Sequence, residues 1–262
     1  MNKKADSSEN VVKLKQGSSA DALARRKGIY LLPNLLTTGA LFAGFYAVLS
    51  GFTGQFELAA IAIFAAMIFD GLDGRVARMT NTQSDFGVQY DSLSDMVSFG
   101  VAPAVVAYGW GVSDLGKLGL AAAFVYASCA ALRLARFNVQ AESSDGKVFT
   151  GLPSPAAAAL VAGFVWSTYE LAPSVALSVL GAVLTAAAGL LMVSNFKYPS
   201  FKEVDLRGKV PFIVILSVVM GFVVITIDPP RILFMLAVFF SFSAPLIWLA
   251  KKLGFSAGPK AD

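Results

Sequence analysis

Apolar residues in this chain occur in long blocks, and these blocks restrict its fold more than any other feature. Hydrophobic residues make up 56% of the 262 positions, charged residues make up 15%, and the mean hydropathy is +0.67. A soluble domain has a smaller apolar share and does not need blocks of this length for its core. Because a helix needs about 20 residues to cross a bilayer, the pattern predicts an all-α, polytopic transmembrane helix bundle.

The blocks predict about eight transmembrane helices. Their expected ranges are 33–53, 57–80, 85–111, 116–136, 153–169, 173–193, 210–227 and 231–250. The second and third continue past their apolar stretch and carry acidic residues at their ends. We expect a transmembrane domain over residues 28–252, preceded by a disordered cytoplasmic tail over 1–27 and followed by a cytoplasmic tail over 253–262.

The basic residues predict the orientation of the bundle. If the N-terminus is cytoplasmic, all of the 21 Lys and Arg residues except Lys117 and Arg231 fall on the cytoplasmic side. Membrane proteins concentrate Lys and Arg in their cytoplasmic loops in this way. We therefore expect a multi-pass protein of the inner (cytoplasmic) membrane with both termini cytoplasmic, surrounded by membrane lipids and without a nucleic-acid partner.

One cysteine and the absence of histidine limit the chemistry available to the chain. A lone cysteine, Cys129, excludes a disulfide framework and a cysteine metal cluster. Without histidine, a general base must be a carboxylate, with lysine or tyrosine as weaker choices.

The segment DGLDGRVARMTNTQSDFGVQYDSLSD, from Asp70 to Asp95, contains two closely spaced pairs of aspartates. Asp70 and Asp73 are three residues apart and Asp91 and Asp95 are four apart, so each pair shares one face of a helix. Four carboxylates on neighbouring helices repel one another unless a cation lies between them. Oxygen ligands favour Mg²⁺ or Mn²⁺ over Zn²⁺.

Small residues and one arginine lie beside the first acidic pair. Gly71, Gly74 and Ala77 leave the helix surface bare, so that a bulky group can approach the backbone. Arg78 lies one turn further along, where it can bind a phosphate as a fork or anchor the end of the helix. A metal site beside a phosphate-binding arginine points to phosphoryl or phosphatidyl transfer from a diphosphate donor.

The pattern D-x2-D-G-x2-A-R-x8-G-x3-D-x3-D resembles the signature of the CDP-alcohol phosphotransferase family at all eight defining positions. In that family an acceptor hydroxyl attacks the lipid-linked phosphate of a CDP-activated donor and expels CMP. The resemblance implies two Mg²⁺ or Mn²⁺ ions held by Asp70, Asp73, Asp91 and Asp95, with Asp95 also as the catalytic base. It implies that the CDP-lipid is contacted by Asn34, Thr37, Gly74, Ala77, Arg78 and Ser84.

Longer segments resemble one branch of this family, the bacterial integral-membrane phosphatidylserine synthases. They are LPNLLTTGALFAGFYA, DSLSDMVSFGVAPA, ALRLARFN with the following GLPSPAAAA, and SNFKYPSFK. The branch implies CDP-diacylglycerol as donor and L-serine as acceptor, and the family suggests a homodimer. Arg133, Arg136 and Asn138 are candidate acceptor contacts, although both arginines can also serve as membrane anchors.

Two alternatives remain open at the level of sequence. The same chemistry with glycerol 3-phosphate or inositol phosphate as acceptor needs a denser basic pocket, which Arg133 and Arg136 could supply. A divalent-cation transporter would use the acids as its coordination site, but it predicts acids spread along a path through the bilayer. Here the acids are concentrated at one end, and Arg78 beside them would repel a moving cation.

Overall fold

The computed structural model describes residues 31–80, 82–141, 149–171, 174–198 and 212–253. This part of the chain forms eight helical segments, one for each helix expected from the sequence. In order they are Leu31–Phe52, α2 (Phe56–Thr80), the continuous run of α3 (Asp85–Asp95), the π-helix η1 (Met96–Val101) and α4 (Ala102–Trp110), then α5 (Lys117–Ala141), α6 (Ser154–Thr168), α7 (Val175–Val193), α8 (Phe212–Ile227) and α9 (Pro229–Lys252). A short 3₁₀-helix, η2 (Val112–Leu115), precedes α5. The two expected tails, apart from Leu253, lie outside the described residues.

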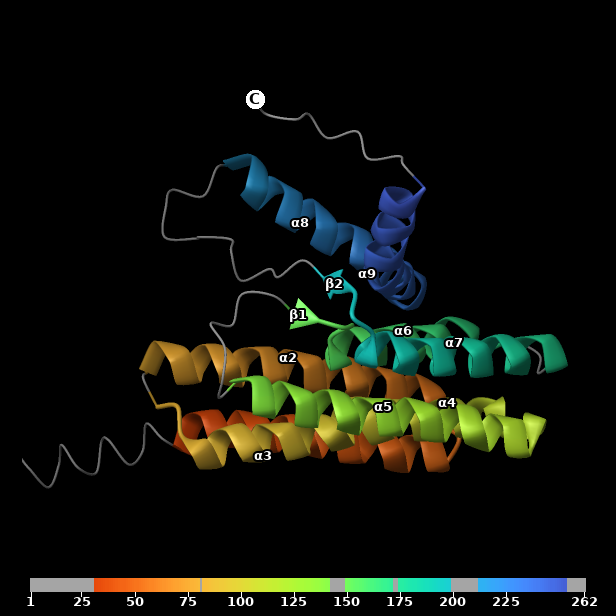
Figure 1. Cartoon of the computed structure of the whole chain (residues 1–262), viewed down its shortest axis with the longest axis horizontal. Helices are drawn as coiled ribbons and strands as arrows, with labels where there is room; N and C mark the ends of the chain where they lie inside the picture. The colour runs from red at the N-terminus through yellow and green to blue at the C-terminus, as the bar shows by residue number, and fades with distance from the viewer. Residues whose placement is uncertain (1–30, 81, 142–148, 172–173, 199–211, 254–262) are drawn as a thin grey trace, which may run out of the picture.

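The helices up to α7 run side by side, whereas α8 and α9 stand at an angle to them (Figure 1). Among the elements from α2 to α9, the most extensive contacts are those of α5 with α7, α6 with α9 and α2 with α6. Small residues allow close approaches between helices, as in other membrane bundles. A Cβ at Gly44 would lie 2.6 Å from the Cα of Ser98, and a Cβ at Gly189 would lie 2.8 Å from the Cα of Tyr126. Larger residues there would force the helices apart.

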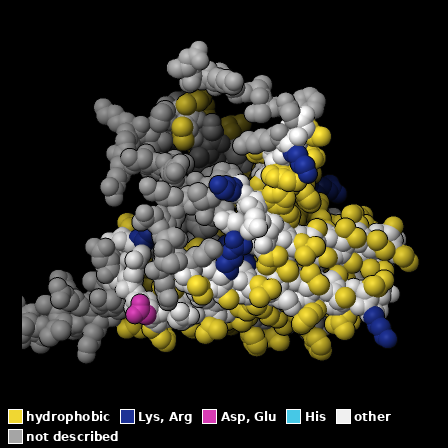
Figure 2. Space-filling view, viewed as in Figure 1, with side chains coloured by type: hydrophobic (Ala, Val, Ile, Leu, Met, Phe, Trp, Pro, Cys, Tyr) yellow, Lys and Arg dark blue, Asp and Glu magenta, His cyan; other side chains and the backbone are white. Residues whose placement is uncertain are grey.

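The outer surface is apolar, which confirms the prediction of a polytopic membrane bundle. Among the described residues, four helices are long and apolar enough to span a membrane: Leu31–Phe52, Lys117–Val139 within α5, α7, and Pro229–Ala250 within α9. Large hydrophobic side chains cover much of the visible surface of the helices up to α7, which form the lower layer in Figure 2. α6 is shorter, at 15 residues, and it is the most enclosed helix, with buried residues along most of its length.

A two-stranded antiparallel pair, which the sequence pattern does not predict, joins the segments before α6 and after α7. In it β1 (Phe149–Thr150) pairs with β2 (Lys197–Tyr198). The backbone N–H of Gly151 donates to the carbonyl of Phe196 at 2.9 Å, and φ of Gly151 is +88°, which only glycine adopts without strain. The Tyr198 hydroxyl donates to the carbonyl of Ser241 at 2.7 Å and ties β2 to α9. Burial raises the pKa of Tyr198 to about 12, so this donor keeps its proton at neutral pH.

The continuous helix formed by α3, η1 and α4, the third of the eight segments, contains a π-helical turn directly after Asp95. The backbone N–H of Ala102 reaches the carbonyl of Val97, five residues earlier. The buried hydroxyl of Tyr126 on α5 donates to the carbonyl of Phe99 at 2.8 Å. Turns of this kind are often found at functional sites, and this one sits next to the acidic cluster.

Candidate active site

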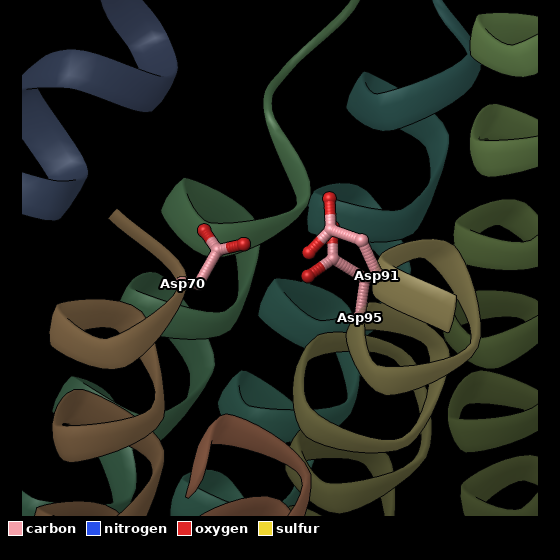
Figure 3. Close-up of side chains that lie close together, drawn as sticks. All are labelled: Asp70, Asp91 and Asp95. Atoms are coloured by element: carbon pink, nitrogen blue, oxygen red, sulfur yellow. The ribbon is translucent and has the colours of Figure 1, made fainter. Parts of the chain in front are cut away.

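Three of the four predicted metal ligands converge between α2 and α3. One carboxylate oxygen from each of Asp70, Asp91 and Asp95 lies within 4.8 Å of the others. Figure 3 shows Asp70 on one helix facing Asp91 and Asp95, which extend side by side from the next. Asp91 and Asp95 are one helical turn apart, so a single face of α3 presents both. The spacing in the sequence therefore predicts this arrangement correctly.

The first helix holds α3 and η1 in place through serine hydroxyls. Ser94 donates to the carbonyl of Thr37 at 3.2 Å, and Ser98 donates to the carbonyl of Ala40 at 3.0 Å. At the start of α3, the Ser84 hydroxyl accepts from the backbone N–H of Gly87 at 3.1 Å and caps the helix. These bonds set the position of Asp91 and Asp95 relative to the helix of residues 31–52.

Asp73 is not one of the three clustered carboxylates and is hydrogen-bonded to the first helix. Its Oδ2 accepts a hydrogen bond from the Thr37 hydroxyl at 2.6 Å, and both side chains are buried. It remains close enough to interact electrostatically with Asp70 and Asp91. Asp73 thus connects the acidic cluster with the first helix.

A cavity of about 320 Å³ opens beside Asp73 and Asp91. It is lined by all six residues expected to contact the CDP-lipid, together with eight others. The full lining is Pro33, Asn34, Thr37, Asp73, Gly74, Ala77, Arg78, Thr82, Gln83, Ser84, Gly87, Val88, Asp91 and Phe137. Arg78 lies over Gly74, because a Cβ built at Gly74 would be 3.7 Å from Nη1 of Arg78. An alanine in place of Gly74 would therefore narrow the space between the backbone and the guanidinium.

Sequence reasoning missed several residues of this cavity. Thr82, Gln83 and Val88 lie inside the motif, but at positions where its pattern allows any residue. Phe137 comes from α5, far from the motif in sequence, and no local pattern marks it. Only the packing of α5 against the third helix brings it to the cavity.

The acidic residues fit a divalent cation. Oδ1 of Asp91 is buried and has no hydrogen-bond partner within the described part of the chain. A buried carboxylate oxygen without a partner is costly, and a cation is the partner that would also relieve its repulsion with Asp70 and Asp95. A set made only of carboxylate oxygens suits the hard ions Mg²⁺ and Mn²⁺.

Arg133, on α5, is a basic residue that lies beside Asp70 and Asp95. Its Nη1 donates to the Ser154 hydroxyl at 2.8 Å, and the guanidinium interacts electrostatically with Asp70 and Asp95. Its Nε is buried and lacks a hydrogen-bond partner among the described residues. The Nε–H of this arginine is therefore a donor without a partner among the described residues.

The other two candidate acceptor contacts lie elsewhere on α5. Arg136 donates from Nη2 to Oδ1 of Asn195 at 3.3 Å. The Asn138 side chain accepts from the Ser92 hydroxyl at 3.1 Å, next to Asp91 in the chain. Arg133 is thus the candidate whose place in the structure best fits a contact to a substrate at the acids.

Comparison with known proteins identifies the family. The sequence model of the CDP-alcohol phosphatidyltransferase family matches residues 30–194, which include the acidic cluster and the cavity. The chain belongs to this family. As a CDP-alcohol phosphatidyltransferase, it is a membrane enzyme of phospholipid synthesis.

Curated relatives of this CDP-alcohol phosphatidyltransferase carry one recurrent name. A CDP-diacylglycerol–serine O-phosphatidyltransferase of Helicobacter pylori J99 is 40% identical over 198 residues, 74% of this chain and 83% of that protein. The enzyme of that name from Bacillus subtilis 168 is 35% identical over 172 residues, 66% of this chain and 92% of that protein.

A solved structure is also similar, although more distantly. The phosphatidylinositol phosphate synthase of Mycobacterium tuberculosis in apo form aligns with a TM-score of 0.43 and 19% identity. The alignment covers 63% of this chain and 84% of that one. A likeness at this level says nothing about the acceptor.

Proposed function

We propose that this enzyme transfers the phosphatidyl group of CDP-diacylglycerol to the hydroxyl of L-serine, forming phosphatidylserine and CMP. One observation supports the site above all others. The clustered acids adjoin a cavity lined by all six residues for which the family resemblance implies contact with the CDP-lipid. The serine acceptor is supported by the names of the curated relatives.

The cavity is proposed to hold the CDP part of the donor. Asn34 and Thr37 from the first helix and Ser84 at the start of α3 supply polar groups along its wall. Arg78 is placed to pair with a diphosphate oxygen, and Gly74 and Ala77 leave room for that group against the backbone of α2. The acyl chains of the donor are proposed to remain in the membrane.

Two Mg²⁺ or Mn²⁺ ions are proposed as the cofactor, with Asp70, Asp73, Asp91 and Asp95 as their protein ligands. When bound, the ions neutralise the diphosphate and the leaving CMP oxygen. The Thr37 hydroxyl holds the Asp73 carboxylate in a fixed orientation. The hydrogen bonds from Ser94 and Ser98 keep Asp91 and Asp95 directed toward α2.

Asp95 is proposed as the group that accepts the proton of the serine hydroxyl. The serine oxygen then forms a bond to the lipid-linked phosphorus, and the bond from that phosphorus to the CMP oxygen breaks. Arg133 lies beside Asp95 with its Nε free of hydrogen-bond partners among the described residues, so it can bind the serine carboxylate. Holding both reactants in this way supplies much of the rate enhancement expected for such a transfer.

The cellular arrangement is also a proposal. The distribution of Lys and Arg supports an active site that faces the cytoplasm from a bacterial inner membrane, with both termini on the same side. The family resemblance supports a homodimer.

An acceptor panel tests the proposed function. The purified enzyme would receive CDP-diacylglycerol with L-serine, glycerol 3-phosphate, glycerol or inositol phosphate, and released CMP would be measured. We expect release only with serine and a lipid product that contains serine. Release with glycerol 3-phosphate or inositol phosphate, but not with serine, would overturn the proposal and show that the acceptor is phosphorylated.

A further inference from the structure

We propose that a second cavity, between the segment after α7 and the last turns of α9, binds the phosphate-bearing headgroup of an anionic membrane phospholipid. Its volume is about 480 Å³, and it is lined by Ser194, Asn195, Phe196, Lys197, Ala244, Ile247 and Trp248. None of these residues lines the cavity beside the acids. The inference does not depend on the identity of the acceptor.

The cavity has an aromatic wall. The rings of Phe196 and Trp248 meet edge to face, with centroids 5.8 Å apart. The Nζ of Lys252 lies 5.0 Å from the centroid of the Trp248 ring, so α9 places a positive charge at this wall. Tryptophan combined with lysine at a helix end is typical of the boundary between acyl chains and headgroups.

The charge of the site is positive. Lys197 and Lys252 are exposed, and neither forms an ion pair with an acid among the described residues. No residue of the cavity lining is acidic. The Asn195 side chain accepts from Arg136 through Oδ1, which leaves its amide N–H groups as donors. Two ammonium groups and an amide donor suit a phosphate rather than a cation or a neutral headgroup.

The position of the cavity favours a membrane lipid as the source of that phosphate. It lies at the ends of α7 and α9, both of which are long and apolar enough to span a membrane. Leu246 and Leu249 of α9 are exposed and offer an apolar surface for acyl chains. Figure 2 shows basic side chains near the junction of α9 with the lower layer, above an apolar surface.

Hydrogen bonds join the cavity wall to the elements that frame the active site. Asn195 is bonded to Arg136 on α5, and the carbonyl of Phe196 accepts from Gly151, three residues before α6. α6 begins at Ser154, which binds Arg133 beside the acids. A headgroup bound in the cavity would therefore restrain the segment after α7, which is hydrogen-bonded to α5 and to the residues before α6.

Quenching of tryptophan fluorescence tests the proposal. The purified full chain in uncharged detergent would be titrated with phosphatidylglycerol or phosphatidylcholine, each with brominated acyl chains. The difference between the unaltered protein and Trp248→Phe isolates the Trp248 signal. From the usual attraction of two lysines, we expect half-quenching at an about tenfold lower mole fraction of phosphatidylglycerol than of phosphatidylcholine.

Paired variants separate a specific site from general charge attraction. The double variant Lys197→Gln/Lys252→Gln should lose the preference for phosphatidylglycerol over phosphatidylcholine. Lys197→Arg/Lys252→Arg should retain that preference. The matched control Lys117→Gln/Arg231→Gln removes the same charge from the other end of the helices and should leave the preference intact. Thermal unfolding in uncharged detergent verifies that each variant is folded. If the double Gln variant is not folded, the single variants Lys197→Gln and Lys252→Gln take its place.

Three results would overturn the proposal. The first is equal quenching of Trp248 by both lipids in the unaltered protein. The second is an equal loss of preference in the control pair, which would indicate only the net charge of the protein. The third is relief of the phosphatidylglycerol quenching by millimolar inorganic phosphate, which would assign the site to a soluble phosphate instead of a lipid.

Discussion

The hydrogen bond between Thr37 and Asp73 allows a quantitative test of how the first helix supports the acidic site. Thr37→Val replaces the hydroxyl by a methyl group of similar size, so the packing of the buried side chain is kept. The carboxylate of Asp73 then loses a donor at 2.6 Å. Hydrogen bonds to charged groups contribute about 1.5–3 kcal/mol.

That range sets the expected loss of activity. If the bond orients Asp73 in the transition state, its removal should lower kcat/KM for CMP release by about 10- to 100-fold, since about 1.4 kcal/mol corresponds to tenfold. The metal concentration that gives half-maximal activity should rise as well, because an unrestrained ligand binds more weakly. Thr37→Ser keeps the hydroxyl and should restore most of the activity.

Thr53→Val is the matched control. Among the described residues, the Thr53 hydroxyl donates to the carbonyls of Leu49 and Ser50 in the last turn of the first helix, and its side chain is exposed at the end opposite Thr37. Its kcat/KM should stay within about twofold of the unaltered enzyme, as for most surface substitutions. If Thr37→Val retained both full kcat/KM and the same metal requirement, the bond would not position Asp73.

Four further predictions follow from the site and the fold. Activity should vanish in excess chelator and return with Mg²⁺ or Mn²⁺, and full activity in chelator would end the metal account. Asp95→Asn should lower kcat by about 10²–10⁴ while CDP-diacylglycerol still binds; normal turnover would favour another base, such as metal-bound hydroxide. Tyr126→Phe removes the buried bond to Phe99 and should lower the free energy of unfolding by about 1–2 kcal/mol, measured by thermal unfolding in detergent; an unchanged midpoint would show that the π-helical turn does not need it. With an impermeant thiol reagent outside intact cells, a cysteine at Asp228 should react and one at Lys197 should not; the opposite pattern would reverse the orientation.

Much of the site could be predicted because it depends on the spacing of residues that are close together in the sequence. The spacing of Asp91 and Asp95 places both on one face of any helix, and the structure confirms this. The six residues for which the family resemblance implies contact with the donor all line one cavity. The hydrogen bond to Asp73 could not be predicted, because its donor Thr37 lies 36 residues earlier and on another helix.

Hydrophobic blocks alone determined the number and the approximate limits of the helices, because a bilayer requires about 20 apolar residues in each crossing. The acidic motif indicated the family and predicted the aspartates that cluster between α2 and α3. Tertiary structure alone decided which side chains meet across helices, namely Arg133 beside the acids, Phe137 in the cavity and the pairing of β1 with β2. These contacts join residues from separate elements, and their geometry depends on how closely the helices pack rather than on any local pattern.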